Sequence, residues 1–115
     1  MSNAKLPAEN VVTYIRCSTG RQNESTASME NQSADLRSYC LRHNFRILEE
    51  FSDEGCSGES NSGLLKAMQY CRQHKEKVHR FVMHDLSRLS RDKESLFSIL
   101  DEFQAMDIDV EVISL

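Results

Sequence analysis

The stretch Val-Val-Thr-Tyr-Ile-Arg-Cys-Ser-Thr-Gly-Arg-Gln, residues 11–22, joins an apolar run to a polar one and decides the fold. Its first six residues are mostly β-branched or aromatic, which predicts a buried β-strand over 11–16. Two arginines then flank a Cys-Ser-Thr triplet, and no Asp or Glu lies between Glu9 and Glu24, although the chain is acidic overall. The sequence therefore predicts a buried strand that ends in a loop of hydroxyl, thiol and guanidinium groups.

Strand and helix patterns alternate along the rest of the chain. Helices are predicted where apolar residues recur three and four positions apart, and strands where short apolar or alternating runs occur. Candidate helix N-caps are Ser25, Thr26 and Ser28 for the first helix and Asp92 for the third. This order predicts a three-layer α/β fold, with a mainly parallel four- to five-stranded sheet flanked by helices. The predicted helices cover about residues 29–43, 64–73 and 93–106, and the predicted strands cover 11–16, 46–52, 79–84 and 108–113.

The length and charge of the chain limit the classes of protein to consider. A chain of 115 residues suits one small domain with one core. Its net charge of −4 argues against a surface that is basic throughout, but it allows a local basic pocket. No apolar run approaches the roughly 18 residues of a membrane span, and no secretory signal opens the chain. We expect a cytoplasmic protein without membrane contact, and we expect residues 1–10 to be a disordered N-terminus or a cloning remnant.

None of the four cysteines belongs to a Cys-x-x-Cys pair, so free thiols are expected in a cytosolic chain. Cys40 and Cys71 each lie three residues before a histidine, His43 and His74, which places each pair on one helix face. Two such pairs would have the ligands of a Cys2His2 zinc site. The favoured interpretation is that the thiols belong to apolar helix faces and the histidines are exposed, so no metal is expected.

Three polar loops follow the first three predicted strands, at residues 17–27, 53–62 and 85–92. Ligands of parallel sheets bind beyond the carboxyl ends of the strands. These three loops are therefore predicted to converge at one site.

The predicted loops, with the strand end before the first of them, contain residue types suited to a phosphate site. Ser18 supplies a hydroxyl nucleophile, and Arg16, Arg21, Arg88 and Arg91 supply guanidinium groups. Guanidinium groups bind phosphate oxygens in bidentate geometry and neutralise transition-state charge. One hypothesis is that Ser18 attacks a phosphate and forms a phosphoserine. The alternative is ordinary turn chemistry for the serine and solvated or ion-paired arginines.

Four motifs, in order across nearly the whole chain, resemble those of the serine recombinases, the resolvase and invertase family of site-specific DNA recombinases. They are YIRCSTGRQ at 14–22, SMENQ at 28–32, DEGCSG at 53–58 and LSRLSRD at 86–92. The last motif, in its form DLSRLSRD, is most similar to the large serine recombinases, which include phage-type integrases and transposon excisionases. The resemblance implies a resolvase-like catalytic domain over residues 11–115.

The resemblance also implies a role for each matching residue. Ser18 would be the nucleophile that attacks a DNA phosphodiester and becomes linked to a 5′ phosphate, while Arg16, Arg88 and Arg91 would hold that phosphate. The full-length protein would act on specific DNA sites as a homodimer and a synaptic tetramer, with no metal and no other cofactor. The supporting residues would be Gln22, Gln32, Ser57, Arg21 and Tyr14.

Two positions depart from the family pattern. Members carry an arginine just before the Gly-Leu that opens the second helix, but here Asn-Ser precedes Gly63, and Arg21 and Arg72 are candidate substitutes. Ser87 stands where an Asp often precedes the first arginine of the last motif. Members also continue into a dimerisation helix and a DNA-binding region, so residues 11–115 are expected to be a truncated catalytic domain.

Four other interpretations stay open. A cysteine phosphatase would need an arginine six residues after Cys17, but that position is Asn23. A nucleotide-binding or flavodoxin-like domain fits the topology, but no glycine-rich phosphate loop is present. A Ser-His-Asp hydrolase would combine Ser18 with His84 or Asp85, but the Gly-x-Ser-x-Gly elbow is missing. The missing arginine also allows a weakly active or inactive interaction domain of the same fold.

Overall fold

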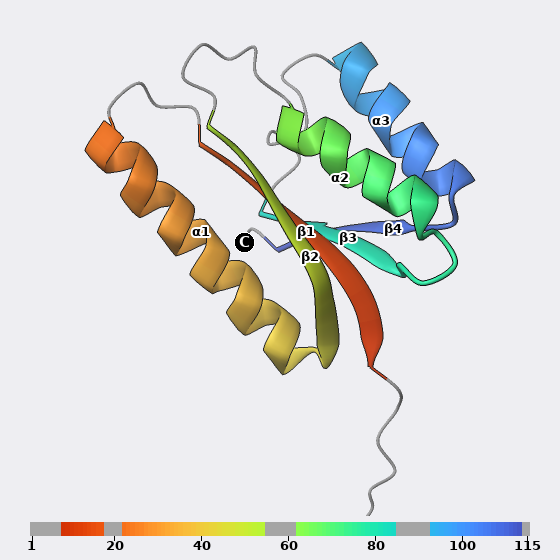
Figure 1. The fold of residues 1–115 in the computed structure, drawn as a ribbon, viewed down its shortest axis with the longest axis horizontal. Helices are drawn as coiled ribbons and strands as arrows, with labels where there is room; N and C mark the ends of the chain where they lie inside the picture. Colours follow the sequence, from red (N-terminus) through yellow and green to blue (C-terminus); the bar gives the residue numbers. More distant parts are fainter. Residues whose placement is uncertain (1–7, 18–21, 55–61, 85–92, 114–115) are drawn as a thin grey trace, which may run out of the picture.

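The computed structural model describes residues 8–17, 22–54, 62–84 and 93–113. Strands and helices alternate along them (Figure 1). In chain order the elements are β1 (Glu9–Cys17), α1 (Gln22–Arg42), β2 (Phe45–Glu54), α2 (Ser62–Gln73), β3 (Arg80–Met83), α3 (Lys93–Ala105) and β4 (Asp109–Val112).

The described strands form one parallel sheet in the order β2-β1-β3-β4. β1 pairs with β2 along its whole length, up to Cys17 opposite Glu54. Its pairing with β3 is shorter and ends where Tyr14 lies opposite Met83. The predicted α/β fold is confirmed. Because the strands are parallel, the carboxyl ends of β1, β2 and β3 lie at the same edge of the sheet.

Helices cover both faces of the sheet, which gives the three predicted layers (Figure 1). α1 packs on one face, whereas α2 and α3 pack on the other. The strand order explains this arrangement, because the chain moves from β1 outward to β2, then back past β1 to β3 and on to β4. Right-handed crossovers that run in opposite directions along a sheet place their helices on opposite faces.

Two apolar cores lie on either side of the sheet. In the core under α2 and α3, the rings of Phe81 and Phe103 are fully buried and stacked at 4.5 Å. The smaller core under α1 includes Leu36, Cys40 and Val82. Consecutive residues of β3, Phe81 and Val82, thus face opposite cores. This is why β3 reads in the sequence as a continuous apolar run.

Two helices end on left-handed residues, Asn44 after α1 (φ 59°) and Asp107 after α3 (φ 62°). After α3, the Asp107 N–H donates to the Gln104 carbonyl and the Ile108 N–H to the Phe103 carbonyl, both at 3.0 Å. These are the two hydrogen bonds of a Schellman motif. Asn and Asp adopt this conformation more readily than other residues with a side chain. The chain can therefore turn from each helix directly into the next strand.

The predicted start of the first helix, in the range 29–43, was wrong. α1 begins at Gln22, so Ser25, Thr26 and Ser28 lie inside the helix and are not its N-caps. The early turns have no apolar period, which is why the pattern did not reveal them. A helix whose later turns pack on a sheet extends through polar residues because each added residue gains a backbone hydrogen bond without a new nucleation step.

Smaller differences occur at other boundaries. β1 begins at Glu9 and β2 continues to Glu54, each beyond its predicted limit. Val112 is 36% exposed because β4 is an edge strand of the described sheet. Asp92, the predicted N-cap of α3, lies outside the described residues. Within the described ranges, no helix has the combination of length and apolar character that a membrane crossing requires.

Candidate active site

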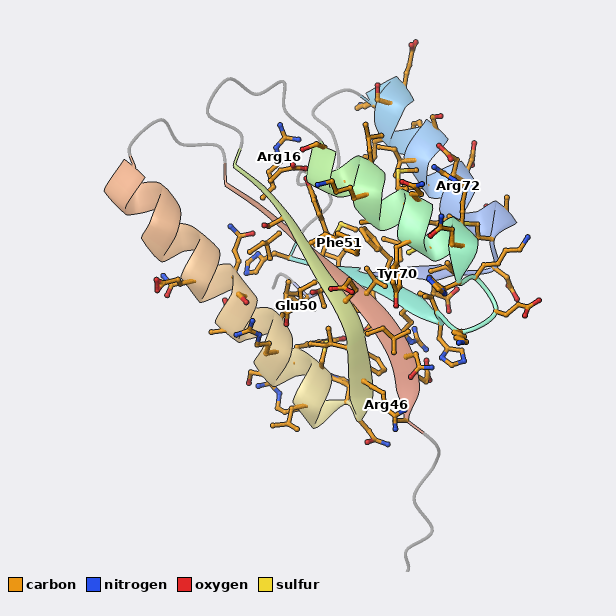
Figure 2. All side chains as sticks on the ribbon, in the orientation of Figure 1. Arg16, Arg46, Glu50, Phe51, Tyr70 and Arg72 are labelled. Atoms are coloured by element: carbon orange, nitrogen blue, oxygen red, sulfur yellow. The ribbon has the colours of Figure 1, made fainter. Side chains whose placement is uncertain are left out.

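The described part of the predicted site lies where β1 and β2 end and α2 begins. Arg16 on β1 is the register partner of Asp53 on β2. Tyr14 lies two residues before Arg16, on the same face of the sheet. Gly63 and Leu64 belong to the first turn of α2. Figure 2 shows Arg16 at this end of the sheet, near the start of α2.

A buried carboxylate, that of Asp53, connects these elements. The residue is only 5% exposed. Its Oδ1 accepts a hydrogen bond from the Gly63 N–H at 2.7 Å, and its Oδ2 accepts bonds from the Leu64 N–H at 2.9 Å and the Tyr14 hydroxyl at 2.6 Å. The first N–H groups of a helix have no partner within the helix, and the positive end of the helix dipole favours an anion there. Asp53 therefore caps α2 from the neighbouring strand.

Tyr14 is fully buried, and its hydroxyl stays protonated. Burial raises the pKa of the Tyr14 phenol well above its ordinary value of 10.0, and the adjacent Asp53 carboxylate raises it further, while the Arg16 guanidinium opposes the change. The phenol can thus act as a permanent donor to Asp53. The hydrogen bond to Asp53 fixes the side chain of Tyr14, which is the neighbour of Arg16 on the same face of β1.

Gly63 is required by the close approach of α2 to β2. A Cβ atom at this position would lie 2.1 Å from the Ser52 carbonyl oxygen and 2.9 Å from Asp53 Oδ1. Both contacts are shorter than real Cβ atoms show, and the first involves backbone that cannot rotate away. The missing side chain therefore lets the first N–H groups of α2 reach the Asp53 carboxylate.

Gln32 of α1 holds the Arg16 backbone from the other face of the sheet. Its Nε2 donates to the Arg16 carbonyl at 3.0 Å, and its Oε1 accepts from the Arg16 N–H at 3.4 Å. The paired residues of β1 and β3 end at Tyr14, before Arg16 is reached. The buried Gln32 amide thus occupies the position of a strand neighbour and satisfies both backbone groups of Arg16.

The structure brings together three of the residues predicted for the site: Tyr14 and Arg16 on one face, with Gln32 bonded to the Arg16 backbone. The backbone of Gln22 opens α1, but its side chain is not described. The strand ends confirm that the loops after β1, β2 and β3 start from one edge of the sheet. The positions of the other predicted residues stay predictions, because they lie outside the described residues: Ser18, Arg21, Ser57, Arg88 and Arg91.

Arg72, proposed from the sequence as a substitute for the missing family arginine, lies in the wrong place. It belongs to the last turn of α2, whereas the site is at the first turn. At 1.5 Å per residue the two ends of this helix are roughly 15 Å apart. Its guanidinium donates to Glu102 of α3 at 3.0 Å. We call the end of the sheet that carries Arg16 the Arg16 edge. Because Arg72 is paired with Glu102 of α3 and lies at the far end of α2, it cannot be a ligand for a phosphate at the Arg16 edge.

The two Cys-His pairs do not form one zinc site. Cys40 lies in the core under α1 and Cys71 in the core on the opposite face of the sheet. Burial raises the pKa of the Cys40 thiol to about 11 and that of the Cys71 thiol to about 12, so both stay protonated near neutral pH. No group of three or more His, Cys, Asp or Glu residues within the described ranges is arranged to hold a metal ion.

His84, considered from the sequence as a possible catalytic base, contacts α1. Its Nε2 lies 3.5 Å from the Oδ2 of Asp35. Asp35 lies one turn after Gln32 on α1. The end of β1 and the residue after β3 are therefore both held by side chains of α1, beyond the point where the β1–β3 pairing ends.

Sequence reasoning quoted Asp53 as part of a motif but did not recognise its role. The signals were present: an acidic residue at the end of a predicted strand, and a Gly-Leu that opens a helix ten residues later. Neither signal is specific alone. The connection depends on Tyr14 and Gly63 lying on either side of the carboxylate, which only the sheet register and the helix position determine.

The fold and this site define a resolvase-like α/β catalytic domain. A family model described as "Resolvase, N terminal domain" matches residues 11–115. The chain is similar to a resolvase family site-specific recombinase from Streptococcus pneumoniae, with 25% identity, a TM-score of 0.81, and coverage of 91% of this chain and 72% of that one. No curated protein matches the sequence.

Two further solved structures share the fold. One is the C-terminal catalytic domain of ISC1926 TnpA, an IS607-like serine recombinase, with 24% identity, a TM-score of 0.76, and coverage of 91% of this chain and 70% of that one. The other is the N-terminal catalytic domain of TP901-1 integrase, with 22% identity, a TM-score of 0.74, and coverage of 91% and 77%. The chain thus belongs to the resolvase family of serine recombinase catalytic domains.

Proposed function

We propose that this chain cuts and rejoins DNA in site-specific recombination, with Ser18 as the nucleophile and a 5′-phosphoserine intermediate. The observation that carries the proposal is the immobilised Arg16 edge. Arg16 lies two residues before Ser18, its backbone is held by Gln32, and its register partner Asp53 is held by Tyr14 and α2.

The rigidity of this edge suits phosphoryl transfer. Catalysis of this reaction consists largely of positioning and of electrostatic stabilisation of the transferring phosphoryl group. A guanidinium on a strand end that is fixed on both faces is preorganised for that task. Loss of one preorganised donor typically lowers the rate by about 10²–10³-fold.

The proposed cleavage step is an in-line displacement at phosphorus. The Ser18 Oγ forms a bond to phosphorus and loses its proton, while the bond from phosphorus to the 3′ oxygen breaks and that oxygen takes up a proton. Arg16, Arg88 and Arg91 neutralise the non-bridging oxygens. Rejoining is the reverse reaction with a new 3′ hydroxyl. The phosphodiester energy is conserved in the phosphoserine, so the proposed reaction needs no energy cofactor. The arginines supply the charge neutralisation, so the proposal includes no metal.

The partners belong to the same proposal. Residues 11–115 would be the catalytic domain of a longer cytoplasmic recombinase, whose further segments supply dimerisation and DNA binding. Two dimers on two DNA sites would form the synaptic tetramer that exchanges strands.

The test uses the full-length protein that contains this domain, incubated with plasmid DNA that carries its recombination site and stopped in denaturant. Wild type and Cys17→Ser should both give protein covalently linked to DNA 5′ ends, and Ser18→Ala should give none. Loss of the adduct in Cys17→Ser alone would show a cysteine nucleophile. Absence of any adduct in wild type would identify an inactive family member, the alternative that the missing arginine before Gly63 suggested.

A further inference from the structure

A basic surface lies at the edge of the sheet opposite to the proposed catalytic edge. It consists of Arg46, near the start of β2, and Lys75 and Lys77, in the turn that joins α2 to β3. All three residues are exposed. Figure 2 shows Arg46 and Arg16 at opposite ends of the sheet.

Asn10 of β1 joins the two parts of this basic surface. Its register partner on β2 is Arg46. On its other side, the Asn10 Nδ2 donates to the Lys77 carbonyl at 3.1 Å, and its backbone N–H donates to the His79 Nδ1 at 2.9 Å. Residues distant in sequence are thus held side by side on an ordered backbone.

The turn that carries the two lysines is itself well connected. The Lys77 and Val78 N–H groups donate to the His74 carbonyl at 2.8 and 3.0 Å, and the His74 N–H continues the helix pattern to the Tyr70 carbonyl. A hollow of about 220 Å³ is lined by residues 72–77. Lys75 and Lys77 are therefore displayed on a backbone that loses little further freedom on binding.

The charges of this surface are available to a partner. Within the described residues, neighbouring cations are paired: Arg72 with Glu102, and Arg80 with Glu9 and Glu111. The side chains of Arg46, Lys75 and Lys77 form no such pair there. With the nearby Glu76, these residues sum to +2 (three cations and one anion) in a chain whose net charge is −4, so the remainder carries −6. The basic surface is a local exception on an acidic body.

We infer that this basic surface binds the phosphate backbone of DNA away from the bond that is cut. The inference rests on the proposed function, which supplies DNA as the polyanion. β1 runs for nine residues between the two edges, which at about 3.3 Å per residue is roughly 26 Å. Phosphates of one strand lie about 3.4 Å apart along the helix axis. A duplex that ran along β1 would thus be contacted about eight base steps from the cut, and a duplex in any other direction would be a second one.

The test is the salt dependence of DNA binding by the 115-residue chain. The double variant Arg46→Gln/Lys77→Gln is compared with Arg42→Gln/Lys66→Gln, which removes the same charges from exposed positions of α1 and α2 that do not belong to the basic surface. A fluorescent 30-base-pair duplex of arbitrary sequence is titrated by anisotropy between 50 and 200 mM NaCl. Each phosphate contact contributes a slope of about −0.9 to log K against log salt.

Loss of two contacts should make the slope shallower by about 1.8, so that the advantage of wild type over the Arg46/Lys77 variant shrinks about tenfold across this salt range. The Arg42/Lys66 control should keep the wild-type slope. Equal slopes for the two double variants would overturn the inference. So would a change in oligomeric state without DNA on sedimentation of the Arg46/Lys77 variant, because the surface would then be a contact between copies. Failure of the proposed function is scored separately, by the Ser18-dependent adduct.

Discussion

Substitution of Asp53 by Asn tests the connection on which the Arg16 edge depends. The side chain keeps its shape but loses its charge and one acceptor. Three donors meet two oxygens here: the Gly63 N–H at Oδ1, and the Leu64 N–H and Tyr14 hydroxyl at Oδ2. The least costly orientation of the Asn amide keeps the two bonds at Oδ2 and turns its NH₂ group toward the Gly63 N–H, leaving that buried donor without an acceptor.

The expected loss of stability follows from these contacts. One unsatisfied buried N–H costs about 1–3 kcal/mol. Each of the two remaining hydrogen bonds changes from a charged to a neutral acceptor and loses about 1 kcal/mol. The helix terminus loses a favourable anion, worth about 0.3–1 kcal/mol. An amide is less costly to bury than a carboxylate, which offsets part of the sum. We expect the free energy of unfolding to fall by about 3 kcal/mol.

Urea unfolding followed by far-UV circular dichroism measures this change. Asp35→Asn is the matched control, because it makes the same chemical change on a side chain that is 61% exposed and contacts only His84 among the ion pairs of the described residues. It should alter stability by less than about 1 kcal/mol. Tyr14→Phe should cost about 1 kcal/mol alone and less in the Asp53→Asn background, because both changes affect one hydrogen bond. If Asp53→Asn is no more destabilising than Asp35→Asn, the carboxylate does not hold this edge and the reasoning fails.

Three further results are expected. Gly63→Ala should cost at least about 3 kcal/mol in the same urea assay, since its Cβ would lie 2.1 Å from the Ser52 carbonyl oxygen; a variant as stable as wild type would contradict the close approach. Gln32→Ala should lower the free energy of unfolding by about 1–2 kcal/mol. It should reduce adduct formation by the full-length protein far more than this loss of stability explains, because it releases the Arg16 backbone. If the loss of adduct were no larger than the loss of folded protein, Gln32 would be purely structural. Burial raises the pKa of the Cys40 thiol to about 11 from 9.0, so stability present below pH 9 should decline as the pH rises from 9 to 11; Cys40→Ala should flatten that decline, and an unchanged slope would assign it to other groups.

The fold was predictable because the signals that determine it are local. Consecutive apolar residues such as Phe81, Val82 and Met83 indicate a strand covered on both faces, and their alternation with helical periods indicates parallel crossovers. The strand order then places the ends of β1, β2 and β3 at one edge. The start of α1 could not be predicted the same way, because its early turns have no apolar side to reveal a helix.

The site was predictable only in part, for a related reason. Arg16 could be named because it lies in a stretch with an unusual composition, and Tyr14 and Gln32 could be named because of the resemblance to the serine recombinases. The role of Asp53 could not, because its partners come from β1 and α2 and meet only through the sheet register. The contact of Gln32 could not be predicted either, because its amide satisfies backbone groups that a longer β3 pairing would otherwise satisfy. In both cases the sequence shows the side chain but not the unpaired group that it must reach.

The burial of Asp53 also resolves an apparent conflict in the proposed mechanism. A carboxylate opposite Arg16 in the sheet would be expected to repel a DNA phosphate, since like charges at short range disfavour each other. Here the carboxylate is 5% exposed, and three donors and the positive end of α2 compensate its charge. The Asp53 carboxylate is therefore not an exposed anion at the register position of Arg16. In the proposed mechanism, an acidic residue in this place orders the strand end that carries Arg16 without adding an exposed negative charge there. An acidic domain would in this way present a cationic site to DNA.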